Sequence, residues 1–136
     1  MAATSLESLA LPVFAAPAAS PANAPFWEAT AAGKLLMKRC EACAKAHFYP
    51  RPHCPFCGSD RTAWVEASGR GEIYTLTHVK KWDVKAAIAF VELEEGPRVQ
   101  ALVADADPTG LRIGDKVVAQ FAPAENGFKV LVFTRA

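Results

Sequence analysis

The sequence has no positive charge near its start and no long apolar run. Its first basic residue is Lys34, although the chain has 15 Lys and Arg residues in all. A secretory signal begins with a basic segment, so the first 33 residues do not resemble one. No apolar stretch approaches the roughly 18 residues that a membrane-spanning helix needs. We therefore expect no membrane association and a reducing, cytoplasmic location.

Several catalytic motifs are also missing. The chain has no Gly-x-Ser-x-Gly turn, no Walker loop and no dinucleotide-binding glycine loop. His78 lies in a predicted strand, and Glu94 and Glu95 precede a turn, where a solvated surface explains them better than an acid–base site. A thiol nucleophile would need a cysteine beyond the four that form the pattern described next. We expect no catalytic residues and no turnover by the isolated chain.

Four cysteines form two Cys-x-x-Cys pairs separated by ten residues: Cys40, Cys43, Cys54 and Cys57. Two such pairs can present four thiolates to one tetrahedral Zn²⁺, which leaves no open position for catalysis. Two disulfides or a redox Cys-x-x-Cys are the alternatives, but paired knuckles without signs of secretion favour zinc. Gly58 is expected in the left-handed conformation, with backbone N–H groups donating to sulfur. The sequence thus predicts one structural Zn²⁺.

Residues around these knuckles have predicted supporting roles. The segment 34–70 carries seven basic and three acidic side chains, a charge of +4 that can offset the −2 of a zinc–tetrathiolate centre. Because four thiolates complete the site, we expect His47 and His53 to be surface residues rather than ligands.

The N-terminal part divides into an arm and a short helix. Residues 1–25 are rich in Ala and Pro and predict a flexible arm. An alternative is an arm that docks a partner through its apolar residues Leu9, Leu11, Val13 and Phe14. Pro25 and Gly33 bracket a two-turn helix. Its aromatic pair, Phe26 and Trp27, either packs on the chain's own ribbon or binds a partner.

Residues after about 68 show short strand patterns separated by turn signals. The predicted strands are Glu72–Val79, Ile88–Leu93, Val99–Val103, Lys116–Phe121 and Phe128–Phe133. Five strands with a long connection between the third and fourth favour an OB-type barrel, and a small SH3-like barrel is the alternative. The predicted fold is mainly β: arm 1–25, helix and zinc ribbon 26–67, and OB-fold barrel 68–136.

A series of short motifs occurs along the chain in one order. They are Phe26-Trp-Glu, Gly33-Lys-Leu, Cys54-Pro-Phe-Cys-Gly, Trp64-Val, Gly69-x-Gly-x-Ile-Tyr and Leu111-x-Ile-Gly-Asp-x-Val. In this order they resemble the family of OB-fold proteins with an N-terminal helix and a rubredoxin-like zinc ribbon, once listed as a domain of unknown function. The resemblance covers residues 26 to about 133 and leaves the arm outside.

This resemblance implies an accessory subunit of a thiolase-superfamily or other acyl-CoA enzyme. Such a subunit stabilises its catalytic partner and helps to hold or pass the coenzyme A thioester. Only the cysteine ligands carry over residue by residue. Two other hypotheses remain. One is an adaptor that binds a catalytic subunit but no small molecule, and the other is a protein that binds single-stranded nucleic acid.

One basic and aromatic cluster lies in the predicted barrel: Lys80, Lys81, Trp82 and Lys85. Cations and a flat apolar ring suit the phosphates and adenine of coenzyme A, and they also suit single-stranded nucleic acid. Phe90 is the one aromatic residue on the second and third predicted strands, and acidic residues follow both strands. The sequence therefore favours the coenzyme A interpretation over nucleic-acid binding.

Overall fold

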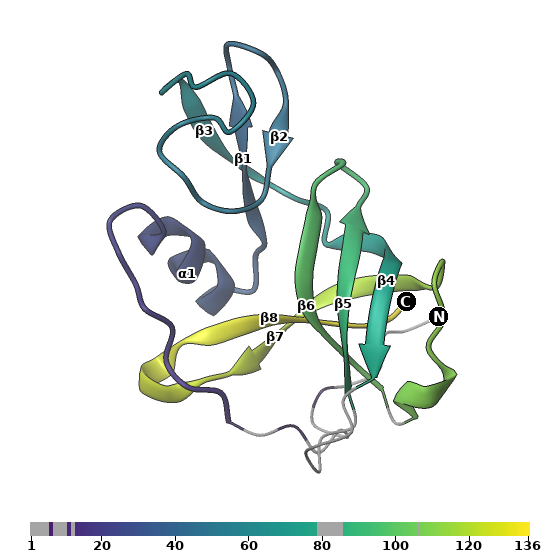
Figure 1. Ribbon diagram of the computed structural model, residues 1–136. Helices are drawn as coiled ribbons and strands as arrows, with labels where there is room; N and C mark the ends of the chain where they lie inside the picture. Colours follow the sequence, from purple (N-terminus) through teal and green to yellow (C-terminus); the bar gives the residue numbers. More distant parts are fainter. Residues whose placement is uncertain (1–5, 7–10, 12, 79–85, 106) are drawn as a thin grey trace.

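The computed structural model describes residues 6, 11, 13–78, 86–105 and 107–136. They form a small three-stranded sheet, a five-stranded barrel and one helix (Figure 1). The elements are α1 (Ala24–Ala31), β1 (Leu36–Cys40), β2 (Ala46–His47), β3 (Thr62–Glu66), β4 (Arg70–His78), β5 (Ala86–Leu93), β6 (Arg98–Ala104), β7 (Lys116–Pro123) and β8 (Lys129–Arg135). No helix in these ranges is long and apolar enough to cross a membrane.

The barrel is closed in the order β4-β5-β6-β8-β7, with β7 pairing back onto β4. The β6–β8 pair is parallel, and the other pairs are antiparallel. One 3₁₀ turn, η2 (Pro108–Gly110), lies in the long connection from β6 to β7, and another, η3 (Glu125–Gly127), joins β7 to β8. The predicted OB-type barrel of five strands is confirmed.

Apolar side chains from alternate strand positions fill the barrel because successive residues of a strand point to opposite faces. On β5, for example, Ala89, Val91 and Leu93 are buried. The largest interior ring is Phe133, which is 0% exposed. At the barrel closure, a Cβ on Gly71 would lie 2.6 Å from the carbonyl oxygen of Glu92. Only glycine lets β4 and β5 approach this closely.

The three-stranded sheet has the order β2-β1-β3. The sequence from Leu35 to Arg39 reads as a strand entering the first knuckle, and β1 confirms it. Phe48-Tyr49 reads as the returning strand, but β2 is the preceding pair Ala46 and His47. Trp64-Val-Glu-Ala67 reads as a lead into the barrel. Instead, β3 pairs with β1 from Leu36↔Glu66 to Cys40↔Thr62 and forms an edge of the sheet.

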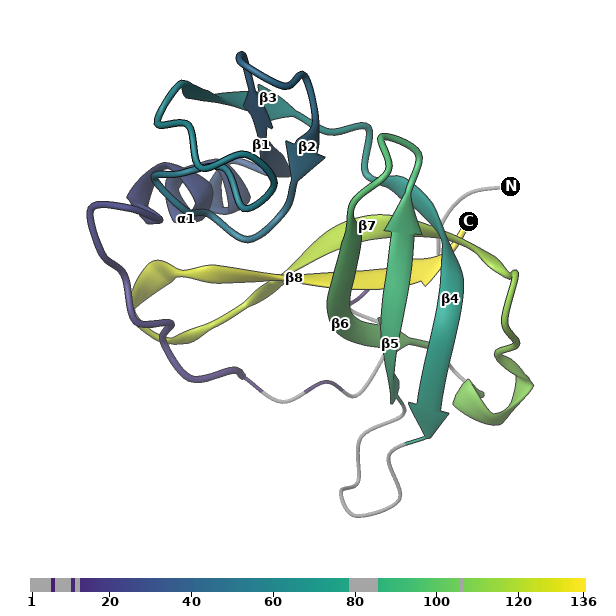
Figure 2. The same ribbon diagram turned by 45° about the horizontal axis from the view of Figure 1, so that its top comes forward.

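Helix α1 lies between this sheet and the β7–β8 hairpin (Figure 2). Proline in its first turn and Gly33 in the left-handed conformation mark its ends, as predicted. Thr30 is fully buried, and its Oγ1 donates to the Lys129 carbonyl oxygen at 2.8 Å. The helix is therefore fastened to β8 by a buried hydrogen bond.

Aromatic rings extend this attachment in edge-to-face contacts. The Phe26 ring centroid lies 4.9 Å from that of Trp27 and 5.5 Å from that of Phe48. Trp27 in turn contacts Phe128, with centroids 6.3 Å apart. Upstream of the helix, Phe14 forms an isolated parallel bridge with Ala124. The division at residues 25/26 and 67/68 stays a prediction, while one hydrophobic cluster contains Phe26, the ribbon's Met37 and barrel residues.

Candidate metal centre

The first knuckle begins where β1 ends. Cys40 is the last residue of β1, and its backbone N–H donates to the Lys45 carbonyl oxygen at 2.9 Å. The Ala44 N–H donates back to the Cys40 carbonyl oxygen at 2.9 Å, and Ala44 has a φ of 63°. This positive φ reverses the chain toward β2. The turn places the Cys43 N–H 3.5 Å from the Cys40 sulfur.

The second knuckle repeats this pattern in the loop between β2 and β3. The Cys54 N–H donates to Ser59, and the Gly58 N–H donates to the Cys54 carbonyl oxygen. Gly58 has a φ of 80°, as the sequence predicted. The Phe56 N–H lies 3.3 Å from the Cys54 sulfur. Both predicted features, the left-handed residue and the N–H groups directed at sulfur, are therefore present.

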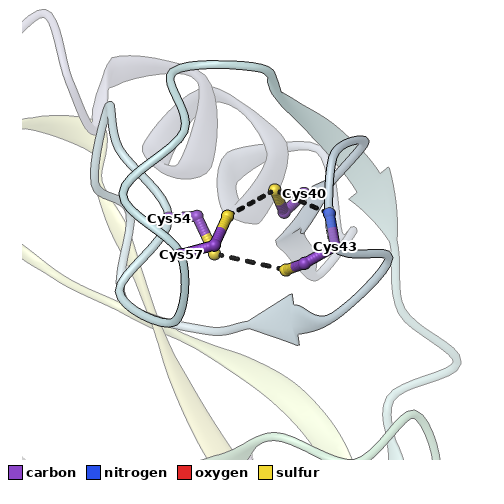
Figure 3. Close-up of side chains that lie close together, drawn as sticks. All are labelled: Cys40, Cys43, Cys54 and Cys57. Carbon is purple, nitrogen blue, oxygen red and sulfur yellow. Dashed lines mark hydrogen bonds between the residues drawn. The ribbon is translucent and has the colours of Figure 1, made fainter.

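The four cysteine side chains converge on one point (Figure 3). All four sulfur atoms lie within 4.8 Å of one another, with Cys40 to Cys57 at 3.6 Å and Cys43 to Cys54 at 3.7 Å. A tetrahedral zinc with Zn–S bonds of about 2.3 Å places its sulfur atoms about 3.8 Å apart. The thiols are free. The donor set and its spacing therefore fit a tetrahedral metal ion.

Backbone donors prepare part of this cluster for ionisation. The Cys43 N–H, as the largest effect, lowers the pKa of Cys40 to about 7. Burial acts to raise the pKa of Cys54, but the N–H groups of Phe56 and Cys57 lower it overall. At Cys57 the Ser59 N–H lowers the pKa, yet burial and the other thiols raise it to about 11. Because the Cys57 thiol resists ionisation, the cluster reaches the full tetrathiolate state only when a cation joins it.

Two lysines of the ribbon, Lys38 and Lys45, have no carboxylate within ion-pair distance in the described part of the chain. Lys38 is only 8% exposed, donates to Thr62 Oγ1 at 3.2 Å and lies over the Trp64 ring at 4.8 Å. Lys45 lies over the Phe56 ring at 5.1 Å. Because the ribbon's basic side chains stack on rings, their charge remains available to offset a thiolate centre and to attract other anions.

His47 lies in the interior, so the expectation that it is a surface residue was wrong. It is 6% exposed, and neither ring nitrogen has a hydrogen-bond partner among the residues that the structure describes. Burial, and then the charges of Lys38 and Arg51, lower the pKa of His47. His47 pairs with Lys38 across β1 and β2, which explains this repulsion. His53 is exposed, as expected.

This histidine predicts an acid-sensitive stability. A folded-state pKa below the unfolded value of about 6.5 means that stability is complete above about pH 6.5 and falls as pH decreases. By about pH 5.5 the loss for one histidine is at most about 1.4 kcal/mol. We expect His47→Phe to lose less unfolding free energy than the wild type between about pH 7.5 and 5.5, as measured by urea denaturation. Both proteins keep the four cysteines, so acid effects on bound zinc cancel; equal pH slopes would contradict the prediction.

The other predicted site residues have different outcomes. Lys80, Lys81, Trp82 and Lys85 lie outside the described residues, so their proposed ligand contacts stay a prediction. Phe26 is 5% exposed and Trp27 is partly buried; both contact neighbouring rings and both line one surface groove, while Trp27 also lines a second. Their predicted contact with a partner also stays a prediction.

Sequence reasoning missed a cation–ring pair on the barrel. The Arg98 guanidinium lies 3.8 Å from the centre of the Tyr74 ring. Arg98 is on β6 and Tyr74 is on β4, with β5 between them. No local pattern reveals such a pair, because it depends on the strand order. The β-bulge between Ile73 and Thr75, which places Tyr74 outside the regular pairing, has no sequence signal here either.

Comparisons with known proteins agree with this architecture. Residues 27–63 match the family model of the ChsH2 rubredoxin-like zinc ribbon domain, and residues 64–122 match that of the ChsH2 C-terminal OB-fold domain. The solved structure named Ltp2-ChsH2(DUF35) aldolase contains a similar chain, with a TM-score of 0.76 and 32% identity. The match covers 88% of this chain and 98% of that one. A DUF35 protein of unknown function from Sulfolobus solfataricus, 14% identical with a TM-score of 0.62, shares the fold.

Relatives found by sequence have names of two kinds. A probable enoyl-CoA hydratase alpha subunit from Thermomonospora curvata is 33% identical over 125 residues, which are 88% of this chain. The match covers only 39% of that subunit. A DUF35 domain-containing scaffold protein from Methanocaldococcus jannaschii is 35% identical over 95 residues, covering 64% of this chain and 67% of that protein. The chain therefore belongs to the DUF35 family and has the rubredoxin-like zinc ribbon and C-terminal OB fold of ChsH2 proteins.

Proposed function

We propose that this protein is a non-catalytic, zinc-binding accessory subunit of an acyl-CoA enzyme, either of the thiolase superfamily or of another class. One observation carries the proposal: the chain matches 98% of a chain in a structure named as a ChsH2-containing aldolase. Relatives named as scaffold proteins and as an enoyl-CoA hydratase subunit support the same context. The subunit stabilises its catalytic partner.

In this proposal the metal is structural Zn²⁺ held by Cys40, Cys43, Cys54 and Cys57. The zinc ion would cross-link the two knuckles. Its role would be structural, because four thiolates leave no position for substrate or water. Backbone N–H groups orient the sulfur atoms, and the cations stacked on aromatic rings offset the negative charge of the centre.

A coenzyme A thioester is the proposed ligand of the complex. Lys80, Lys81, Trp82 and Lys85 are the proposed contacts to its phosphates and adenine, on their chemistry alone. The described barrel surface gives little support to nucleic-acid binding. Three of its strand cations are paired with carboxylates: Arg70 with Glu94, Arg98 with Glu92 and Lys116 with Glu72. A phosphate track needs unpaired cations.

Affinity purification of the tagged chain from its native host tests the proposal. We expect a thiolase-superfamily enzyme, hydratase or aldolase to co-purify in a fixed ratio, identified by peptide mass spectrometry. The isolated chain should show no turnover of acyl-CoA thioesters, because no nucleophile, base and oxyanion donors are assembled in the described residues. The partner enzyme should lose thermal stability when the chain is removed.

Two results would contradict the proposal. One is robust hydrolysis or thiolysis of acyl-CoA by the isolated chain. The other is native purification that repeatedly recovers no acyl-CoA enzyme at all. A Cys54→Ser chain assayed in parallel is the control for ribbon integrity, since a partner that recognises the folded ribbon should be lost with it.

A further inference from the structure

Among the residues that the structure describes, four large aromatic side chains are exposed. The exposed fractions are 68% for Tyr49, 57% for Phe56, 49% for Tyr74 and 43% for Phe90. Two come from the zinc ribbon and two from the barrel. Single exposed aromatic side chains are common on protein surfaces. The four rings indicate a binding surface only if they lie together on one face.

Shared neighbours place all four rings on one face. Phe90 on β5 is directly opposite Gln100 on β6, and both side chains are exposed on the outside of the barrel. Gln100 and Tyr49 line the same groove of about 330 Å³. This groove joins the outer surface of β6 to the ribbon loop.

A second groove extends the same face. It has a volume of about 490 Å³ and is lined by Phe56 and Lys45 of the ribbon and by Arg98 of β6. Arg98 reaches across the outside of β5 to stack on Tyr74. The strands β4, β5 and β6 lie side by side along one wall of the barrel, with the ribbon sheet near the β5–β6 turn in both views (Figures 1 and 2). We call this surface, defined by Tyr49, Phe56, Tyr74 and Phe90, the aromatic face.

A cation lies over three of these four rings. The Arg51 guanidinium lies 5.4 Å from the Tyr49 ring centre, Lys45 lies 5.1 Å from that of Phe56, and Arg98 lies 3.8 Å from that of Tyr74. Arg98 also has an ion pair with Glu92 at 3.0 Å. Within the described ranges, neither Lys45 nor Arg51 lies within ion-pair distance of a carboxylate. The ribbon end of the face therefore has two cations outside any ion pair, with Glu95 lining the same groove as Lys45, and the barrel end is balanced.

We propose that the aromatic face is the docking surface for the catalytic subunit, an inference that rests on the proposed accessory function. The matching partner surface carries apolar side chains opposite Tyr74 and Phe90 and carboxylates opposite Lys45 and Arg51. Tyr and Arg inside a rim of ion pairs are typical of protein–protein interfaces. A nucleic-acid strand crossing β4–β6 would meet carboxylates paired to the cations it needs, so a protein is the better occupant.

Binding of purified partner subunit to single variants tests the docking surface. Tyr74→Ala and Phe90→Ala should each weaken binding about tenfold or more, as residues at an interface centre do. The double variant Lys45→Glu and Arg51→Glu should slow association and remove much of its dependence on salt. Ile113→Ala is the matched control, since this side chain is 67% exposed and lies outside the face. Zinc content and thermal unfolding of every variant confirm that it is folded.

The outcomes separate this inference from the proposed function. If the wild type binds an acyl-CoA enzyme and both ring variants bind it equally well, the docking surface is wrong and the accessory function stands. If no acyl-CoA enzyme binds the wild type, the accessory function itself fails. Binding of labelled poly-deoxythymidine that Tyr74→Ala abolishes, with enzyme binding intact, would assign the face to nucleic acid. A wild-type dimer in sedimentation that Phe90→Ala dissociates, again with enzyme binding intact, would assign it to a second copy.

Discussion

Replacing Cys54 by serine is expected to leave well under one zinc per chain and to unfold the ribbon. A serine hydroxyl is not a thiolate ligand, and structural zinc contributes about 10–16 kcal/mol of apparent binding free energy in zinc-finger peptides at neutral pH. Apart from the pairing of β1 with β3, the ribbon has little else to hold its knuckle loops in place. Its strand β2 has two residues, and the knuckle loops rest on a few turn hydrogen bonds.

Hydrogen exchange shows which part of the chain unfolds when the metal is lost. Amides of residues 36–66 should exchange rapidly in Cys54→Ser, while those of β5, β6 and β8 remain protected, because buried Val and Phe side chains pack between these strands inside the barrel. His53→Ala, adjacent to the replaced residue but exposed, should keep the metal and full protection. Wild-type protein that lacks zinc and has its cysteines oxidised in pairs would contradict the metal assignment.

The predictable parts of this fold are those that short-range chemistry determines. Two Cys-x-x-Cys pairs predicted the convergence of the four sulfurs, since each knuckle is a local turn closed by its own backbone hydrogen bonds. The short strand patterns of β5 and β6 and the turn signal Glu125-Asn-Gly127 likewise predict strands and a hairpin close to those observed, and Asn126 has a φ of 60° in that hairpin.

The parts that sequence did not predict depend on contacts distant in the chain. The strand β3 forms because all five of its residues pair with β1. The sequence of residues 62–66 does not by itself predict this pairing. His47 is buried because β2 places it opposite Lys38, and polar residues give no sequence signal for such burial. The Arg98–Tyr74 contact needs the strand order of the closed barrel. The Arg98–Tyr74 contact also belongs to the proposed docking face.

The position of Phe26 bears directly on which aromatic residues a partner can reach. The sequence left two interpretations of its ring, internal packing and partner contact. In the structure the ring is 5% exposed and lies edge-to-face against both Trp27 and Phe48, so it joins α1 to the ribbon. A ring in this position contributes to the folding stability of the isolated chain, without a partner.

Phe26→Ala is therefore expected to destabilise the isolated, zinc-loaded protein by about 3–5 kcal/mol, the usual cost of truncating a buried phenylalanine. This is a large share of the roughly 5–15 kcal/mol that stabilises a domain, so the midpoint of denaturant unfolding should fall markedly. Tyr49→Ala is the matched control: its ring is 68% exposed, and the change should stay within about 0.5 kcal/mol. If Phe26→Ala instead keeps full stability and loses only its partner, the ring is an interface anchor. Loss of stability without any partner present means that α1 stabilises the fold, and the rings left for docking are the exposed ones on the aromatic face.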